Sequence, residues 1–283
     1  MQKAISKYWP VFVLPTLIAF IIGFIWPFIW GTYLSFQRFT TVSKTTFVGI
    51  QNYLSVFQDS TFLHAFGFTA VFTVVSTVLI NVCAFAIALV LTRGIKGTNL
   101  FRTVYFMPNL IGGILLGYIW QILLNGVLAN LQKPLLALDA KAGFVGLVIL
   151  MCWQQIGYMM IIYIAGLQAV PEDMLEAAKI DGASNMHILL AIVLPLVKNI
   201  FFTVMLVNFI GFWNDYQVPL LYMPSYPTVA YGMYNMANTR ENNLSSVPMR
   251  MTGAMLMFIP IFTLFLIFQK RLLGNLTVGG IKG

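Results

Sequence analysis

The chain has 283 residues, of which 59% are hydrophobic and only 8% are charged. Soluble domains carry about 25% charged residues, so this chain cannot cover its surface with polar groups and must use lipid as part of its solvent. The net charge of +8 does not indicate nucleic-acid binding, because the basic residues are spread singly at the ends of apolar segments, where membrane topology places them.

Six apolar runs, each close to the roughly 20 residues that cross a bilayer, predict six transmembrane helices. They cover residues 9–33, 65–91, 104–124, 143–167, 188–213 and 252–268. We therefore expect an all-α, polytopic membrane protein with both termini on one side. Segments on the side of the N-terminus hold ten of the sixteen basic residues, and this bias predicts that both termini are cytoplasmic.

Catalytic and metal-binding signatures are missing from the sequence. The two cysteines, Cys83 and Cys152, lie inside apolar runs, and the two histidines, His64 and His187, are far apart. We find no zinc-binding spacing, no glycine-rich phosphate loop and no nucleophilic serine elbow. The sequence therefore predicts neither an enzyme nor a metal site.

Charge is densest in the segment EDMLEAAKIDGASNMHILLAIVLP, residues 172–195, which follows the fourth apolar run and enters the fifth. A short helix should begin near Pro171 and end at about Ile180, with Gly182 in a left-handed conformation. Ser184 or Asn185 can cap the next helix. A helix of about ten residues is marginal alone, so it needs a partner. That partner is either this chain's own helices or a groove on another protein.

Polar and aromatic side chains inside the fourth and fifth runs are candidates for a substrate path, because polar groups at membrane depth usually face a protein interior or a wet cavity. The candidates are Trp153, Gln154, Gln155, Tyr158, Asn208, Trp213 and Asn214. Amides and aromatic faces suit a carbohydrate. The alternative is that the amides join helices and that the aromatic residues anchor span ends.

Four stretches resemble permease subunits of binding-protein-dependent ABC importers. Glu176-Ala177-Ala178, Asp181-Gly182-Ala183, Ile192 and Leu194-Pro195 resemble the family's EAA motif. The other three resemble its sugar-importing branch: FVGIQNYLSVFQD at 47–59, FRTVYFMPNLIGGILLGYIW at 101–120 and NLTVGGIKG at 275–283.

This resemblance implies a type I ABC importer permease fold. It divides the chain into residues 1–64, the first transmembrane helix and an extracytoplasmic segment, and residues 65–283, the core permease domain. Residues 171–187 would form a cytoplasmic coupling loop that sits in a cleft on an ATPase subunit. The coupling residues would be Glu176, Ala177, Ala178, Asp181, Gly182 and Ala183.

The resemblance also implies function and partners. The chain would be a non-catalytic permease that moves a sugar or oligosaccharide by alternating access. Its partners would be a second, different permease subunit, two cytoplasmic ATPase subunits, an extracytoplasmic sugar-binding protein and the lipid bilayer. The chain itself would hold no cofactor, because ATP and Mg would bind to the ATPase subunits.

The competing interpretation is an ion-coupled secondary transporter of a small polar solute. Transporters of that class usually need carboxylates inside the membrane as relays or ion ligands. Every acidic residue here except Asp215 lies in a loop or at a span boundary, which favours the ATP-driven importer.

Overall fold

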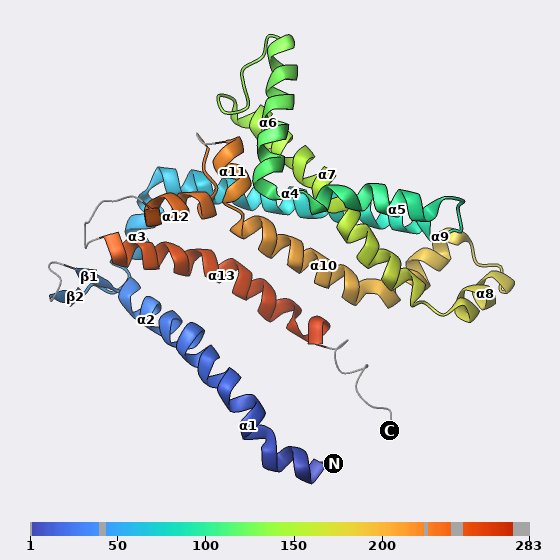
Figure 1. Ribbon diagram of the computed structural model, residues 1–283, viewed down its shortest axis with the longest axis horizontal. Helices are drawn as coiled ribbons and strands as arrows, with labels where there is room; N and C mark the ends of the chain where they lie inside the picture. The colour runs from blue at the N-terminus through green and yellow to red at the C-terminus, as the bar shows by residue number, and fades with distance from the viewer. Residues whose placement is uncertain (1, 40–43, 224–225, 239–245, 274–283) are drawn as a thin grey trace. The chain divides into compact units, whose positions relative to one another are not determined.

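The computed structural model describes residues 2–39, 44–223, 226–238 and 246–273, and it is helical apart from one short hairpin and the connecting turns (Figure 1). Six helices in the described part of the chain are long and apolar enough to cross a membrane. They span Tyr8–Ser35, Ser60–Leu91, Gly113–Asn130, Ala140–Gln168, Asn185–Asn214 and Val247–Lys270. The all-α class and the number of spans are confirmed, whereas the cytoplasmic location of both termini stays a prediction.

Two spans contain a π-helical turn, and in both the turn directly precedes an X-Pro pair. The first span comprises α1 (Gln2–Phe20), the turn η1 (Ile21–Ile25) and α2 (Trp26–Ser35). The fifth comprises α9 (Asn185–Ile188), the turn η3 (Leu189–Val193) and α10 (Leu194–Asn214). Proline cannot donate the usual helical hydrogen bond, and the wider turn keeps the helix continuous up to it.

The contacts divide the chain into two compact units, residues 1–63 with 233–259 and residues 64–232 with 260–283. The first unit holds the hairpin of β1 (Gln37–Phe39) and β2 (Thr45–Phe47), helix α3 (Gln51–Gln58) and parts of α12 (Val229–Asn238) and α13 (Ser246–Leu273). The hairpin, in which Gln37 pairs with Phe47, was not predicted. The functional division of the chain at residue 64 stays a prediction.

Buried hydrogen bonds explain two residues of the FVGIQNY segment in the first unit. The Asn52 amide donates to the carbonyl oxygens of Ser35 and Gln37 at 2.8 and 2.9 Å. The hydroxyls of Tyr53 and Ser35 lie 2.7 Å apart. The Asn52 bonds satisfy two backbone carbonyls at and just after the end of the first transmembrane helix, and the Tyr53 bond joins two side chains there. Asn52 and Tyr53 therefore hold α3 against that end.

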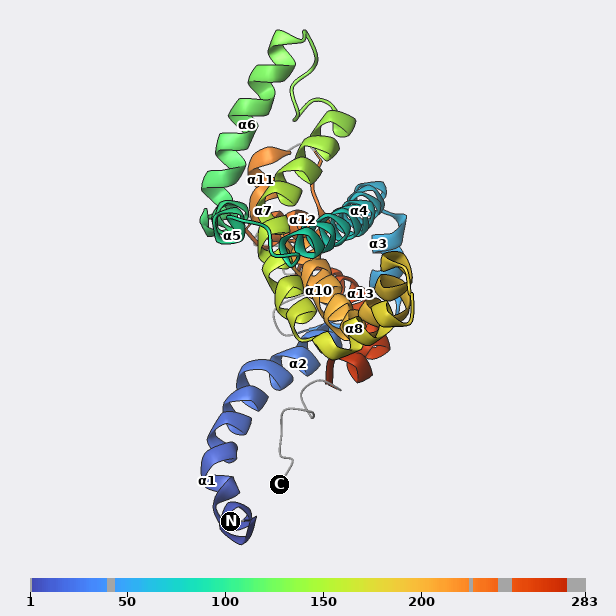
Figure 2. The same ribbon diagram turned by 90° about the vertical axis from the view of Figure 1, so that its right-hand side faces the viewer.

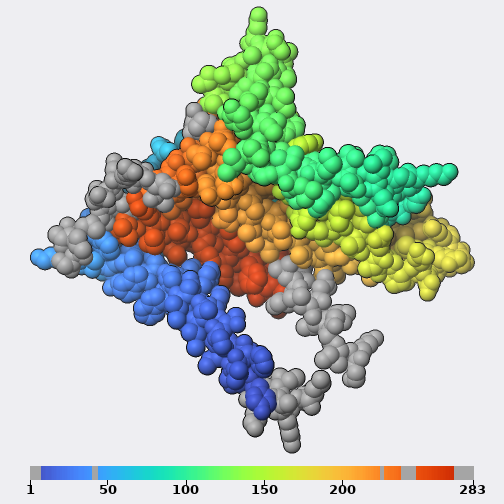
Figure 3. Space-filling model, viewed as in Figure 1, coloured from blue at the N-terminus to red at the C-terminus, as the bar shows by residue number. Residues whose placement is uncertain are grey.

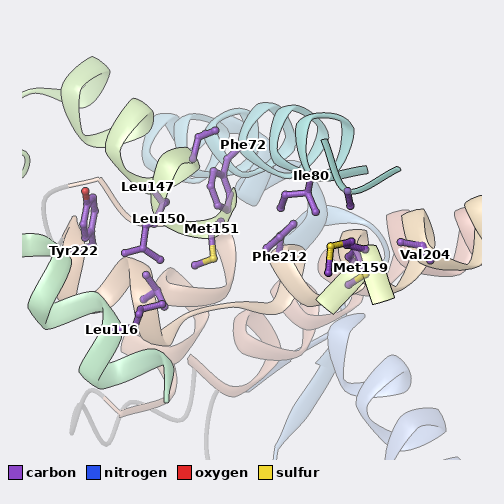
Figure 4. Close-up of a cluster of buried hydrophobic side chains, with 14 of the residues drawn as sticks. Phe72, Ile80, Leu116, Leu147, Leu150, Met151, Met159, Val204, Phe212 and Tyr222 are labelled. Atoms are coloured by element: carbon purple, nitrogen blue, oxygen red, sulfur yellow. The ribbon is translucent and has the colours of Figure 1, made fainter. Parts of the chain in front are cut away.

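The second unit contains most of the buried core. Its complete elements are α5 (Thr98–Phe106), the 3₁₀ turn η2 (Met107–Leu110), α6 (Gly113–Asn130), α7 (Ala140–Gln168), α8 (Glu172–Ile180), α9, η3, α10 and α11 (Gln217–Tyr222). Helix α4 (Ser60–Leu91) belongs to it from His64 onward. Figure 4 shows its apolar core, where Phe72 of α4 and Phe212 of α10 lie near Met151 of α7. The rings of Phe72 and Phe212 pack edge to face, with their centroids 5.9 Å apart.

Hydropathy predicts that the third span covers residues 104–124, but the structure places it elsewhere. The chain breaks after α5, passes through η2 and becomes extended at Ile111 and Gly112 before α6 begins at Gly113. Pro108 lacks the N–H that a continuous helix needs, and the Gly112-Gly113 pair favours a change of direction. The spanning helix is therefore Gly113–Asn130, and α5 is a separate helix.

Helices α5 and α7 approach each other closely (Figure 3). The approach is tightest at Gly157, where a Cβ atom would lie 1.7 Å from the carbonyl oxygen of Tyr105. Only glycine fits there. Small residues allow helix backbones in membranes to pack closely, and this one fixes α5 and η2 against the middle of α7.

Candidate coupling surface and transport cavity

Helix α8 is built from strong local signals. Glu172 and Asp173 occupy its first turn and Lys179 its last, so the charges match the helix dipole. Gly182 has a φ of +81°. Its N–H donates to the carbonyl of Lys179, and the N–H of Ala183 donates to that of Ala178. This pair of bonds is a Schellman motif, which ends the helix at the predicted place.

The start of α9 is also set locally. The Ser184 hydroxyl accepts the N–H of His187 at 3.2 Å, so Ser184 is the cap and Asn185 is the first residue of the helix. Helix α9 continues through η3 into α10 as one apolar rod of 30 residues. The Gly182 turn is therefore joined to a transmembrane helix by only two residues, Ala183 and Ser184.

Within the part of the chain that the structure describes, helix α8 buries none of its side chains. Glu176 and Ala177 are exposed, Ala178 is partly buried, and Ile180 is 79% exposed. Beside the helix lies a hollow of about 550 Å³. It is lined by Ala178, Asp181, Gly182, Ala183, Ser184, His187 and Ile192. The structure thus gathers four of the six predicted coupling residues at one hollow, and Glu176 and Ala177 lie on the adjoining helix.

In Figure 1, α8 and α9 lie at the end of the second unit where α7 ends and where residues 92–97 join α4 to α5. Those residues hold Arg93 and Lys96. The two segments that we predict to be cytoplasmic therefore share one end of this unit.

A cavity of about 450 Å³ with several polar side chains in its lining is formed by α7, α10, the start of α11 and Gly113 at the start of α6. Figure 2 shows α7 and α10 beside each other, in agreement with their contacts. Five of the seven predicted substrate-path residues line this cavity: Gln154, Gln155, Tyr158, Asn208 and Asn214. Their common location could not be read from the sequence, because it depends on how the two helices face each other.

The two tryptophans among the predicted residues do not line the cavity. Trp213 is only 2% exposed and packs edge to face on Phe66 at 5.3 Å and in parallel with Phe209. Trp153 is 42% exposed, and its ring centroid lies 5.4 Å from that of Trp120. The packing of Trp213 indicates a structural role, and Trp153 lies on the lining helix α7 without joining the lining.

Amide groups in the cavity are incompletely satisfied. Asn208 is 3% exposed, and its Nδ2 atom has no hydrogen-bond partner among the described residues. Gln154 donates to the Ile111 carbonyl and Asn109 donates to Gln155, both at a long 3.4 Å. Buried polar atoms are nearly always hydrogen-bonded in native proteins, so this cavity has donors that suit a polar solute.

Three further lining residues, Asp215, Tyr216 and Gln217, were not among the predicted ones. Asp215 ends α10, and its Oδ1 atom accepts the N–H groups of Gln217 and Val218 at 3.0 and 3.3 Å. Burial raises the pKa of the Asp215 carboxyl, and these two hydrogen bonds oppose the rise. The sequence signal was available: an aspartate two residues before an apolar, proline-containing run is a typical helix cap.

Comparison with known proteins shows the family. Residues 95–276 match the model of the binding-protein-dependent transport system inner membrane component. The chain is 38% identical over 201 residues to a probable starch degradation products transport system permease protein, AmyD, of Thermoanaerobacterium thermosulfurigenes. That match covers 69% of this chain and 68% of the relative.

Two other comparisons agree with this family. The chain is 33% identical over 222 residues to the sn-glycerol-3-phosphate transport system permease protein UgpA of Brucella abortus, covering 74% of this chain and 75% of the relative. A crystal structure of a bacterial alginate ABC transporter, in complex with alginate pentasaccharide-bound periplasmic protein, contains a similar chain with a TM-score of 0.74. That match has 16% identity and covers 95% of each chain, so it shows the fold alone.

The predicted resemblance is therefore confirmed, as are the ABC importer permease fold and the non-catalytic role, because this family is the membrane component of a transport system. The C-terminal stretch NLTVGGIKG at 275–283 lies outside the described residues. The chain is a multi-pass protein of the cell membrane and belongs to the family of binding-protein-dependent transport system inner membrane components.

Proposed function

We propose that this chain is one permease subunit of an ATP-driven importer that takes a sugar or oligosaccharide from an extracytoplasmic binding protein. ATP and Mg would bind to two cytoplasmic ATPase subunits, and a second, different permease would complete the pathway. Relatives named for starch degradation products and for multiple sugars support a carbohydrate substrate.

The observation that carries this proposal is the exposure of α8. A nine-residue helix with no buried side chain has little reason to stay folded on its own contacts. Its C-terminus is nevertheless closed by a Schellman motif, its first turn carries two acidic residues, and the hollow beside it has both polar and apolar walls. These features suit a helix that docks in a groove on a partner protein, here an ATPase subunit.

The path from α8 to the cavity runs through α9, the π-helical turn η3 and α10, which form one continuous helical span. A force on α8 reaches α10 through the turn at Gly182 and the cap at Ser184. Asn208 lies 13 residues after Pro195 on the same helix, which is about 20 Å along the axis. A tilt of α10 driven by the ATPase would therefore move Asn208 and Asn214 relative to the amides of α7. We infer that this movement exposes the cavity alternately to the two sides.

The test uses the assembled importer in proteoliposomes. Glu176→Lys and Gly182→Pro should abolish co-purification of the ATPase subunits and ATP-dependent maltotriose uptake, while the chain still inserts in the membrane. Normal uptake with either variant would refute the coupling role. ATP-independent uptake by the purified chain would instead favour an ion-coupled secondary transporter.

A further inference from the structure

We propose that the cavity between α7, α10 and α11 admits uncharged, hydroxyl-bearing solutes and excludes anionic ones such as uronates and sugar phosphates. This inference rests on the proposed transport function and adds a charge selectivity to it. It follows from three features of the lining. These are its single charge, its amide groups and the N–H groups of Gln217 and Val218, which already donate to Asp215.

The lining carries one acidic side chain and no basic one among the described residues. The acid is Asp215, and the other polar lining groups are amides and tyrosines. Both side-chain hydrogen bonds of Asp215 end on Oδ1, so among the described residues Oδ2 has no partner and can accept a hydrogen bond from a solute. A solute hydroxyl can donate to this oxygen, whereas a carboxylate or phosphate oxygen meets a like charge.

The amides complement a hydroxyl rather than an anion. The buried Nδ2 of Asn208 needs an acceptor, and the long contacts of Gln154 and Gln155 leave them able to re-pair. One hydroxyl of a solute can accept from Asn208 while another donates to Asp215. Tyr158, 39% exposed, adds an aromatic surface to the lining, which suits the apolar C–H face of a sugar ring.

Backbone N–H groups in the lining could attract an anion in place of basic side chains, and two of them belong to Gln217 and Val218, which follow Asp215. Here two of those donors, from Gln217 and Val218, already bind the carboxylate of Asp215. The chain therefore supplies its own anion to these donors. A solute anion would find the donors occupied and a negative group beside them.

The test measures solute binding directly, by saturation-transfer NMR on the assembled importer in nanodiscs without the external binding protein. The two probes are maltotriose and the same trisaccharide oxidised at C6 to the uronate, which differ mainly in charge. We expect the uronate to bind at least about tenfold more weakly, because unit like charges a few ångströms apart repel strongly even in a polar site.

Two variants should reduce or abolish the selectivity for different reasons. Asp215→Asn removes the charge but keeps the cap, because asparagine caps as well as aspartate, and it should bring the two affinities to within about threefold. Gln217→Lys adds a cation and should strengthen uronate binding about tenfold, whereas Gln217→Met, of similar length, should leave the ratio of the two affinities unchanged.

Equal binding of both probes by the wild type, or an unchanged ratio in Asp215→Asn, would overturn the charge selectivity while leaving the transport cavity intact. A different result would refute the claim that solute binds in this cavity. If Asn208→Leu left both signals unchanged, or if the wild type gave a signal with neither probe, solute would not use this site and the proposed function would fail together with the selectivity.

Discussion

Replacing Gly157 with alanine should separate α5 from α7. The added Cβ would lie 1.7 Å from the carbonyl oxygen of Tyr105 and 2.2 Å from its carbonyl carbon. Ordinary contacts of this kind exceed 3 Å, so the two backbones must move apart by well over 1 Å. The obstacle is backbone rather than the end of a flexible side chain. We therefore expect a destabilisation near the upper end for overpacked cores, about 3 kcal/mol.

Thermal unfolding of the purified chain in detergent measures this effect. A loss of about 3 kcal/mol corresponds to a fall in Tm of about 6–12 °C. The matched control is Gly126→Ala in α6, where a Cβ would meet nothing within 4 Å and where alanine is the better helix former. A Tm for Gly157→Ala within about 1 °C of the wild type would refute the close approach of α5 and α7.

Three further predictions concern the coupling turn and the cavity. Gly182→Ala should destabilise the left-handed turn by about 1 kcal/mol and reduce ATP-dependent uptake. The control Gly94→Ala, with a similar φ of +75° and open space around it, should leave uptake normal. Equal losses of uptake in the two variants would contradict the coupling role. Asn208→Leu should raise the free energy of unfolding by about 1 kcal/mol, because it removes a buried donor that has no partner among the described residues, and it should abolish uptake. A less stable variant in chemical denaturation would show that the amide is satisfied. Because burial raises the pKa of the Asp215 carboxyl, its charge should be lost on acidification at a higher pH than that of an ordinary aspartate, so the exclusion of uronates should relax as the pH falls, before it reaches the usual aspartate pKa of about 3.9. A binding ratio that stays constant down to that pH would contradict the role of Asp215.

The sequence was most informative where structure is determined locally. Helix α8, the left-handed Gly182 and the cap of α9 all follow from residues that lie within one turn of one another. The structure has the helix and Gly182 as predicted, and of the two predicted caps, Ser184 and Asn185, it has Ser184. The spans were also visible, because bilayer thickness sets their length. The third span was misplaced because its hydropathy continues through Pro108 and Gly112, so an average over the window concealed a break that these residues indicate.

The composition of the cavity was only partly predictable. Helix α10 is apolar on nearly all sides, so its sequence does not reveal which face Asn208 and Trp213 turn towards. Asn208 lines the cavity, whereas Trp213 is buried against Phe66 of α4. Gln217 joins the lining because α11 packs on α6 and α7, a tertiary contact without a local signature.

The central claim is that α8 docks on an ATPase subunit, and site-specific photo-crosslinking tests it most directly. A photoreactive residue replacing Ile180, which is 79% exposed on α8, should give an adduct with the ATPase in the assembled importer. The same residue replacing Leu138, 69% exposed and beyond the opposite end of α7, should not. Adducts from position 180 with lipid alone, or with the ATPase from position 138 instead, would contradict the coupling account.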